Sequence, residues 1–289
     1  MIRYIVFDLD ATLGNMNTIY FLLRTLRPRN FWKEQPGPTI SPNPVEGQLE
    51  NVYRTFVKEV AQNERSSNPL GIVRPGIFRV LEHIPNTPMI IYSNNGDINL
   101  SECIRDILRS GINNPTAIDE CVTWFHPIRQ ATEIAETRHL LDKSDEDAYP
   151  WPGGRSPKTW ATLQEILQRG PLQATNVQPQ EVLFLDDNMY PDLKLHLQDN
   201  YLRVSRYNYK CPLDPLLKIL EPLLETIDWT QYSKLLSESI PGCTIQSVSD
   251  LRTYLETNTR KTDSAPIPNE DVETMIAFVK TKIECVETL

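Results

Sequence analysis

The chain has 289 residues, enough for one large domain or two small ones. Its 38 acidic residues outnumber its 29 lysines and arginines, and the resulting formal net charge of −9 argues against a general nucleic-acid binder. Hydrophobic residues make up 40% and charged residues 23% of the chain. These are ordinary globular values, so a folded protein is expected.

Neither a membrane segment nor a disulfide framework is expected. The apolar runs are all of strand length, and an acid follows the first of them at position 8, too early for a signal peptide. The five cysteines include no Cys-x-x-Cys pair, which suggests neither paired disulfides nor a zinc site. We therefore expect an intracellular protein, cytoplasmic or nuclear.

Five short runs rich in β-branched and aromatic residues predict strands. The first, second and fourth runs do not alternate between polar and apolar residues, which is typical of strands buried on both faces of a parallel sheet. The predicted strands are Arg3–Asp8, Pro88–Tyr92, Cys121–Trp124, Glu181–Leu185 and Tyr201–Val204.

Helical patterns lie between these runs. Apolar residues at helical spacing predict one helix over 100–108 and another over 160–167. Ser156 as N-cap and Pro157 at the first helical position predict where the second helix begins, and place Lys158 in its first turn. Strands that alternate with helices predict an α/β fold, a parallel sheet with helices on both faces. Its site should lie outside the carboxyl ends of the strands.

Three segments depart from this alternation. Residues 14–73 contain two helical stretches joined by a proline-rich segment, and are a candidate cap over the site. Residues 126–157 lack a pattern and indicate a long surface loop. From 211 to 289, apolar residues at helical spacing predict a helical extension, which either packs on the core or docks a partner protein. We therefore expect an α/β domain over 1–210, followed by this extension.

Two acids follow the first predicted strand. Asp8 and Asp10 are two residues apart, so both carboxylates can face one pocket. Such a pair suits Mg²⁺, which prefers carboxylate and phosphate oxygens. It also suits a division of labour in which one carboxylate attacks and the other shuttles a proton. A polar loop without chemistry is the alternative.

Three further positions carry candidate chemistry. Ser93, after the second strand, and the backbone N–H groups of its turn could hold phosphate oxygens, with a plain turn as the alternative. Lys158 in a first helical turn would oppose the helix dipole, which a role in binding phosphate or the charge of a nucleophile would explain, although a solvated lysine is the more common case. Asp186 and Asp187 directly follow the fourth strand and repel each other unless a cation lies nearby, so they are candidates to complete a metal site, with a polar loop start as the alternative.

In order and spacing, these four positions resemble the haloacid-dehalogenase (HAD) superfamily of phosphotransferases. The resemblance covers about residues 1–206. It implies a HAD-like catalytic domain over 1–210 and a Mg²⁺-dependent phosphatase that works through an aspartyl-phosphate. Three motifs are most similar to the NLI-interacting-factor-like branch, which includes phosphatases of the carboxy-terminal domain of RNA polymerase II. These motifs are Asp8-Leu9-Asp10-Ala11-Thr12-Leu13, Arg74-Pro75-Gly76 and Leu185-Asp186-Asp187-Asn188.

The resemblance implies three catalytic residues. Asp8 would be the nucleophile, with its second oxygen on Mg²⁺. Asp10 would protonate the leaving oxygen and then take a proton from the attacking water, while its backbone carbonyl contacts the metal. Lys158 would neutralise the charge shared by Asp8 and the transferring group.

The resemblance also implies binding residues. Thr12 would hold the loop after the first strand by hydrogen bonding. Ser93, with the N–H of Asn94, would bind a phosphoryl oxygen. Asp187 would ligate Mg²⁺, and Asp186 would orient metal-bound water or Lys158.

Several functions stay open at this stage. The substrate is either a phosphorylated protein, with phosphoserine or phosphothreonine, or a small phosphomonoester or nucleic-acid end over which residues 14–73 would close. A non-catalytic binding module that uses its C-terminal helices is the third possibility. All four positions carry suitable residues, which favours an enzyme. Asp10 disfavours a dehalogenase, because the dehalogenases of the superfamily lack an acid there.

Overall fold

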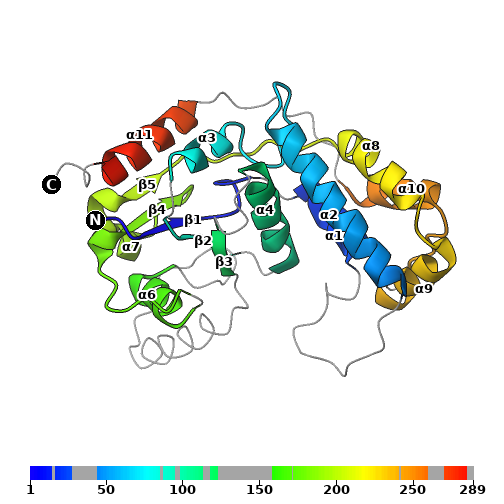
Figure 1. The fold of residues 1–289 in the computed structure, drawn as a ribbon, viewed down its shortest axis with the longest axis horizontal. Helices are drawn as coiled ribbons and strands as arrows, with labels where there is room; N and C mark the ends of the chain where they lie inside the picture. Colours follow the sequence, from blue (N-terminus) through cyan, green and yellow to red (C-terminus); the bar gives the residue numbers. More distant parts are fainter. Residues whose placement is uncertain are drawn as a thin grey trace, which may run out of the picture.

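A five-stranded parallel sheet forms the centre of the molecule. The computed structural model describes residues 1–14, 17–27, 44–84, 87–94, 98–112, 118–122, 158–170, 172–240, 242–259 and 270–284. The strand order is β3-β2-β1-β4-β5, and helices cover both faces (Figure 1). The strands are β1 (Tyr4–Phe7), β2 (Met89–Tyr92), β3 (Ile118–Val122), β4 (Val182–Asp186) and β5 (Tyr201–Arg203). The predicted α/β fold class is confirmed.

The central strand β1 is buried on both faces. Ile5 and Phe7 belong to one hydrophobic cluster, whereas Tyr4 and Val6 belong to a second cluster on the opposite face of the sheet. Strand β1 pairs with β2 on one side and with β4 on the other. A strand in this position needs apolar residues throughout, which explains the absence of alternation in its sequence.

The predicted start of the third strand, at Cys121, was wrong. The structure begins β3 at Ile118, whose partner in β2 is Met89, and ends it at Val122. In the sequence, two acids at 119 and 120 interrupt the apolar run, so the pattern indicated a strand only from Cys121 onward. Strand β3 lies at the edge of the sheet, where polar residues are tolerated. Trp124, the predicted end, lies outside the described residues.

Helices lie on both faces of the sheet. Helices α6 and α7 pack on one face, and the other described helices share one hydrophobic cluster with the opposite face, although α8, α9 and α10 lie beside α1 and α2, away from the strands (Figure 1). No helix in the described ranges combines the length and apolarity needed to cross a membrane. The helices are α1 (Asn17–Leu26), α2 (Pro44–Glu64), α3 (Ile77–Glu82), α4 (Ile98–Gly111), α6 (Trp160–Arg169), α7 (Pro191–Leu197), α8 (Leu213–Leu224), α9 (Trp229–Ser239), α10 (Val248–Asn258) and α11 (Glu270–Glu284).

The C-terminal helices pack on the rest of the chain. Helix α8 lies against α2, α10 against α1 and α8, and α11 against α3 (Figure 1). Leu216, Leu217 and Leu220 of α8 are buried in the same cluster as the apolar side chains of α2. The domain boundary at 210 and a closing cap over 14–73 stay predictions, and the predicted surface loop over 126–157 lies outside the described residues.

A buried carboxylate holds the loop between α2 and α3. Glu64 is 5% exposed and accepts hydrogen bonds from the backbone N–H groups of Gly71 (3.1 Å) and Ile72 (2.6 Å). Burial raises the pKa of Glu64 from 4.5 to about 7, although these donors lower it. Between these two pH values the folded protein keeps a proton that the unfolded chain has released.

We expect the Glu64→Gln variant to lose part of the pH dependence of stability. For the wild type, the contribution of Glu64 to the free energy of unfolding falls as the pH rises from 4.5 to about 7. The fall is at most roughly 3 kcal/mol. Glutamine does not titrate, so the variant lacks this fall. Urea unfolding at about pH 5 and about pH 8 measures the difference, and parallel profiles for the two proteins would contradict the prediction.

Candidate functional site

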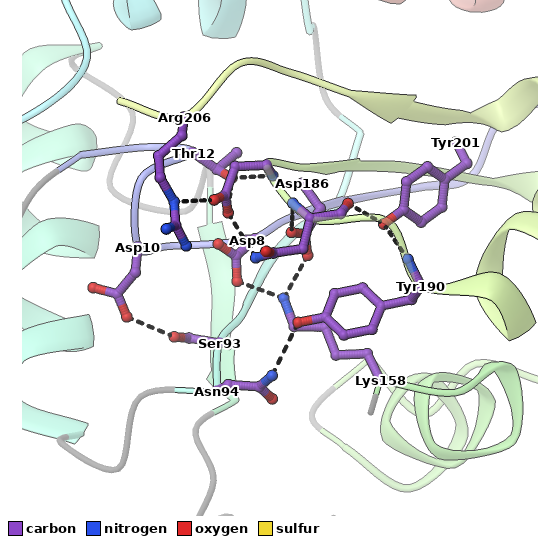
Figure 2. A network of polar contacts seen from close by, with 12 residues as sticks. Asp8, Asp10, Thr12, Ser93, Asn94, Lys158, Asp186, Tyr190, Tyr201 and Arg206 are labelled. Atoms are coloured by element: carbon purple, nitrogen blue, oxygen red, sulfur yellow. Dashed lines mark hydrogen bonds and ion pairs between the residues drawn. The ribbon is translucent and has the colours of Figure 1, made fainter. Parts of the chain in front are cut away.

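Three buried aspartates meet where β1 and β4 end. Phe7 of β1 pairs in register with Leu185 of β4, so Asp8 and Asp186 leave adjacent strands side by side (Figure 2). One carboxylate oxygen of each of Asp8, Asp186 and Asp187 lies within 4.8 Å of the others. The three residues are 5%, 0% and 5% exposed. The predicted acidic positions therefore converge at the carboxyl edge of the sheet.

A fully buried lysine joins two of these aspartates. The Lys158 Nζ donates to Asp8 Oδ1 and, at 2.7 Å, to Asp186 Oδ2 (Figure 2). The ammonium group also lies 5.2 to 5.5 Å from three aromatic ring centroids, those of Tyr92, Phe184 and Tyr190. Aromatic faces stabilise a cation that is shielded from water. The environment thus fixes Lys158 beside Asp8.

The predicted start of the helix after this lysine was wrong. Helix α6 begins at Trp160, and its N-cap is Thr159, whose side chain accepts a hydrogen bond from the Thr162 N–H at 3.2 Å. Lys158 therefore precedes the cap instead of lying in the first turn. Its side chain is drawn to buried carboxylates, not placed against the helix dipole. The predicted N-cap, Ser156, lies outside the described residues.

Burial is the largest single influence on the pKa values of Asp8, Asp186 and Lys158. It raises the pKa of Asp8, and the charge of Asp186 raises it further, while Lys158 opposes both. Burial also raises the pKa of Asp186, again against Lys158. For Lys158, burial acts to lower the pKa, but the two carboxylates outweigh it and raise the pKa, so the ammonium stays charged at neutral pH.

The loop after β1 is tied to the end of β4. The hydroxyl of Thr12 accepts a hydrogen bond from the Asp187 N–H at 2.9 Å and lies 3.5 Å from Asp187 Oδ1. Arg206, just beyond β5, forms an ion pair with the other oxygen of Asp187, Oδ2, at 2.9 Å. The Nδ2 of Asn188 donates to Asp187 Oδ1 at 3.0 Å. These contacts fix the orientation of Asp187.

The remaining predicted residues lie beside this aspartate cluster (Figure 2). The Ser93 Oγ, after β2, lies 3.5 Å from Asp10 Oδ2, and Asp10 is partly exposed (Figure 2). Asn94 donates from Nδ2 to the hydroxyl of Tyr190 at 3.0 Å. The structure therefore brings all eight predicted site residues to one edge of the sheet. Asp10 is not part of the three-carboxylate cluster.

Two residues of this network were missed from the sequence. Tyr190 contacts Asn94 and covers Lys158, and Arg206 pairs with Asp187. Both lie just beyond the carboxyl ends of predicted strands, where sites of parallel sheets form, and this position was the available signal. Neither residue type in a loop points to phosphate chemistry by itself.

The donor set fits a divalent cation. Three carboxylates face one buried ammonium and the guanidinium of Arg206, whose side chain is 61% exposed, so negative charge is in excess. Oxygen ligands with excess negative charge are what Mg²⁺ prefers. The structure places the carboxylates of Asp8, Asp186 and Asp187 close enough to hold such an ion. The resemblance implies that Asp8 and Asp187, with the backbone carbonyl of Asp10, would be its ligands.

We expect Mg²⁺ to stabilise the wild type against thermal unfolding. Binding to the folded state alone adds about 2.7 kcal/mol at a concentration 100 times the Kd. The Asp187→Asn variant should lose most of this gain, because it removes one anionic ligand, whereas Asp199→Asn, at an exposed position, should keep it. Melting curves with Mg²⁺ and with a chelator measure both. Equal shifts in the two variants would argue against a metal site at Asp187.

Comparison with known proteins gives distant structural neighbours. No family model and no curated protein matches the chain. Its neighbours among solved structures are HAD-superfamily hydrolases. The L-2-haloacid dehalogenase of Xanthobacter autotrophicus shares 13% identity at a TM-score of 0.33, covering 89% of this chain and 99% of that one. The magnesium-bound HAD hydrolase YfnB of Bacillus subtilis shares 13% identity at 0.33, covering 76% and 98%.

A third neighbour is a subfamily IA HAD hydrolase of Geobacter sulfurreducens. It shares 12% identity at a TM-score of 0.29, and the match covers 68% of this chain and 85% of that one. With similarities this distant, any assignment of family depends on the strand order and side chains of the chain itself.

Proposed function

We propose that the chain is a Mg²⁺-dependent phosphatase of the HAD superfamily, which hydrolyses phosphate monoesters through an aspartyl-phosphate. The observation that carries the proposal is the buried Lys158 ammonium between Asp8 and Asp186, with Asp187 alongside. A chain rarely buries three carboxylates and a lysine at one sheet edge without a function, because their desolvation is costly. The resemblance of these positions to the superfamily agrees with this arrangement.

In the first half-reaction, Asp8 attacks phosphorus. A bond forms between a carboxylate oxygen of Asp8 and phosphorus, and the bond from phosphorus to the leaving oxygen breaks. Asp10 gives its proton to that oxygen. Lys158 holds Asp8 Oδ1 and thereby orients the carboxylate for attack. Phosphoryl transfer depends mainly on such positioning and on charge stabilisation.

In the second half-reaction, water attacks the phosphorus of the aspartyl-phosphate. Asp10 takes a proton from this water, and the bond between phosphorus and Asp8 breaks, which releases phosphate and regenerates the carboxylate. Ser93, 3.5 Å from Asp10, would bind a phosphoryl oxygen beside it. When bound, Mg²⁺ would supply positive charge to the phosphoryl oxygens in the transition state.

Asp10 favours a phosphatase over a dehalogenase. Phosphate-ester cleavage needs an acid for the leaving oxygen, whereas loss of halide needs none. The carboxylate of Asp10, in the loop that follows Asp8, is partly exposed and lies beside Ser93, which suits that role (Figure 2). Within the phosphatases, a protein phosphoserine or phosphothreonine substrate remains our proposal, on the resemblance to the NLI-interacting-factor-like branch.

The test is hydrolysis of para-nitrophenyl phosphate by the purified chain, with Mg²⁺ and with a chelator, followed by phosphoserine peptides and small phosphomonoesters. We expect turnover that requires Mg²⁺ and falls by about two to four orders of magnitude in Asp10→Asn. Release of chloride from 2-chloropropionate serves as the dehalogenase control and should not occur. Turnover unchanged by the chelator, or halide release without phosphatase activity, would overturn the proposal.

A further inference from the structure

A buried arginine joins three distant segments next to the site. Arg74, just before α3, is 5% exposed. Its Nε donates to the carbonyl of Thr12 at 2.8 Å, and its Nη2 donates to the carbonyls of Ala11 at 2.8 Å and Ser205 at 2.6 Å. Its Nη1 forms an ion pair with Asp271 of α11 at 3.1 Å. The planar guanidinium suits such a fork of acceptors.

Arg74 holds the loop that carries Asp10 and Thr12. Besides its side-chain contacts, the backbone N–H of Arg74 donates to the carbonyl of Leu13 at 2.7 Å, so one residue fixes three consecutive carbonyls. Ala11 has a φ of +64°, a left-handed conformation that costs a residue with a Cβ about 1 to 2 kcal/mol. The contacts of Arg74 with the loop carbonyls help to offset this cost, together with the hydrogen bonds inside the loop.

Asp271 in turn holds Arg74. It supplies the carboxylate that balances the buried guanidinium, and it also accepts a hydrogen bond from the Ser205 hydroxyl. A buried charge that loses its counter-charge is strongly destabilised. The chain of contacts runs from α11 through Arg74 to Thr12, and from Thr12 to Asp187.

We propose that Asp271, on the C-terminal helix α11, is a positioning residue that acts through Arg74 to hold the Asp10–Thr12 loop in its working conformation. Helix α11 is thus a support of the candidate active site rather than a free docking element. The effect on turnover rests on the proposed phosphatase function, whereas the effect on the conformation of the loop does not.

The experiment compares Asp271→Asn with Glu273→Gln. Glu273 lies on the same helix and pairs with Arg79 of α3 at 2.8 Å, so its variant also removes one ion pair between α11 and α3 without touching Arg74. Kinetics with para-nitrophenyl phosphate and hydrogen exchange of the backbone amides of Ala11, Leu13 and Gly14 are measured for both. All three amides are hydrogen-bonded within the loop.

We expect Asp271→Asn to lower kcat about tenfold or more with a much smaller change in KM, because misplaced catalytic groups slow the chemical step. The loop amides should exchange faster in this variant, and Glu273→Gln should change neither quantity. Arg74→Lys, which keeps the charge but loses the fork, should behave like Asp271→Asn. Equal effects of the two helix variants, or unchanged exchange in Asp271→Asn, would overturn the proposal. If the wild type has no turnover, the hydrogen exchange of the loop amides in the two helix variants tests the proposal by itself.

Discussion

Asparagine in place of Asp8 is expected to abolish turnover without weakening the fold. The amide nitrogen and oxygen cannot replace the attacking carboxylate, and loss of a nucleophile costs about four to six orders of magnitude in kcat. Stability should stay within about 1 kcal/mol of the wild type or rise, because the change removes one of three crowded negative charges. The Lys158–Asp186 pair is retained.

The measurement pairs steady-state hydrolysis of para-nitrophenyl phosphate with thermal unfolding in the absence of Mg²⁺. Asp199→Asn, which makes the same chemical change at an exposed position, is the matched control and should keep full activity. Substantial turnover in Asp8→Asn would show that another group attacks phosphorus.

Replacing Lys158 by methionine is expected to destabilise the folded protein, unlike the replacement of Asp8 by asparagine. Methionine fits the aromatic surroundings but leaves Asp8 and Asp186 buried without a counter-charge. Removal of one partner from a buried ion pair typically costs 3–5 kcal/mol, so we expect a loss of about that size. Activity should fall as well, since the carboxylate of Asp8 loses the group that orients it.

Urea unfolding near pH 7 measures this loss, with Lys234→Met, at an exposed position, as the control. At lower pH the difference in the free energy of unfolding between Lys158→Met and the wild type should become smaller, because protonated carboxylates need no counter-charge. A Lys158→Met protein as stable as the wild type at neutral pH would mean that the lysine does not hold the cluster together.

The sequence predicted the strands and their acids better than the contacts between them. Buried strands such as Val182–Asp186 have a dense apolar pattern, and residues that follow parallel strands must meet at one edge, so Asp8 and Asp186 could be placed together. The start of α6 and the partners of Arg74 could not be derived in this way. Thr159 is the N-cap, and the side chain of Lys158 just before it is buried against Asp8 and Asp186.

Contacts between residues far apart in the chain leave no local pattern in the amino-acid sequence. The ion pair of Arg74 with Asp271 joins residues 197 positions apart, and no periodicity or motif in the chain indicates it. Likewise, the apolar stripes of the C-terminal helices show that these helices need a partner, but not which one. In the structure, α8 packs against α2, and α10 packs against α1.

The position of β1 in the middle of the sheet has a consequence for synthesis of the protein. One neighbour, β4, begins about 175 residues after β1 ends. At about 5–20 residues per second, roughly 9 to 35 s pass on the ribosome before β4 is made. During that time one edge of an apolar strand stays unpaired, and exposed strand edges promote aggregation. We therefore expect that shielding of this strand edge until β4 is made limits aggregation of the newly made chain.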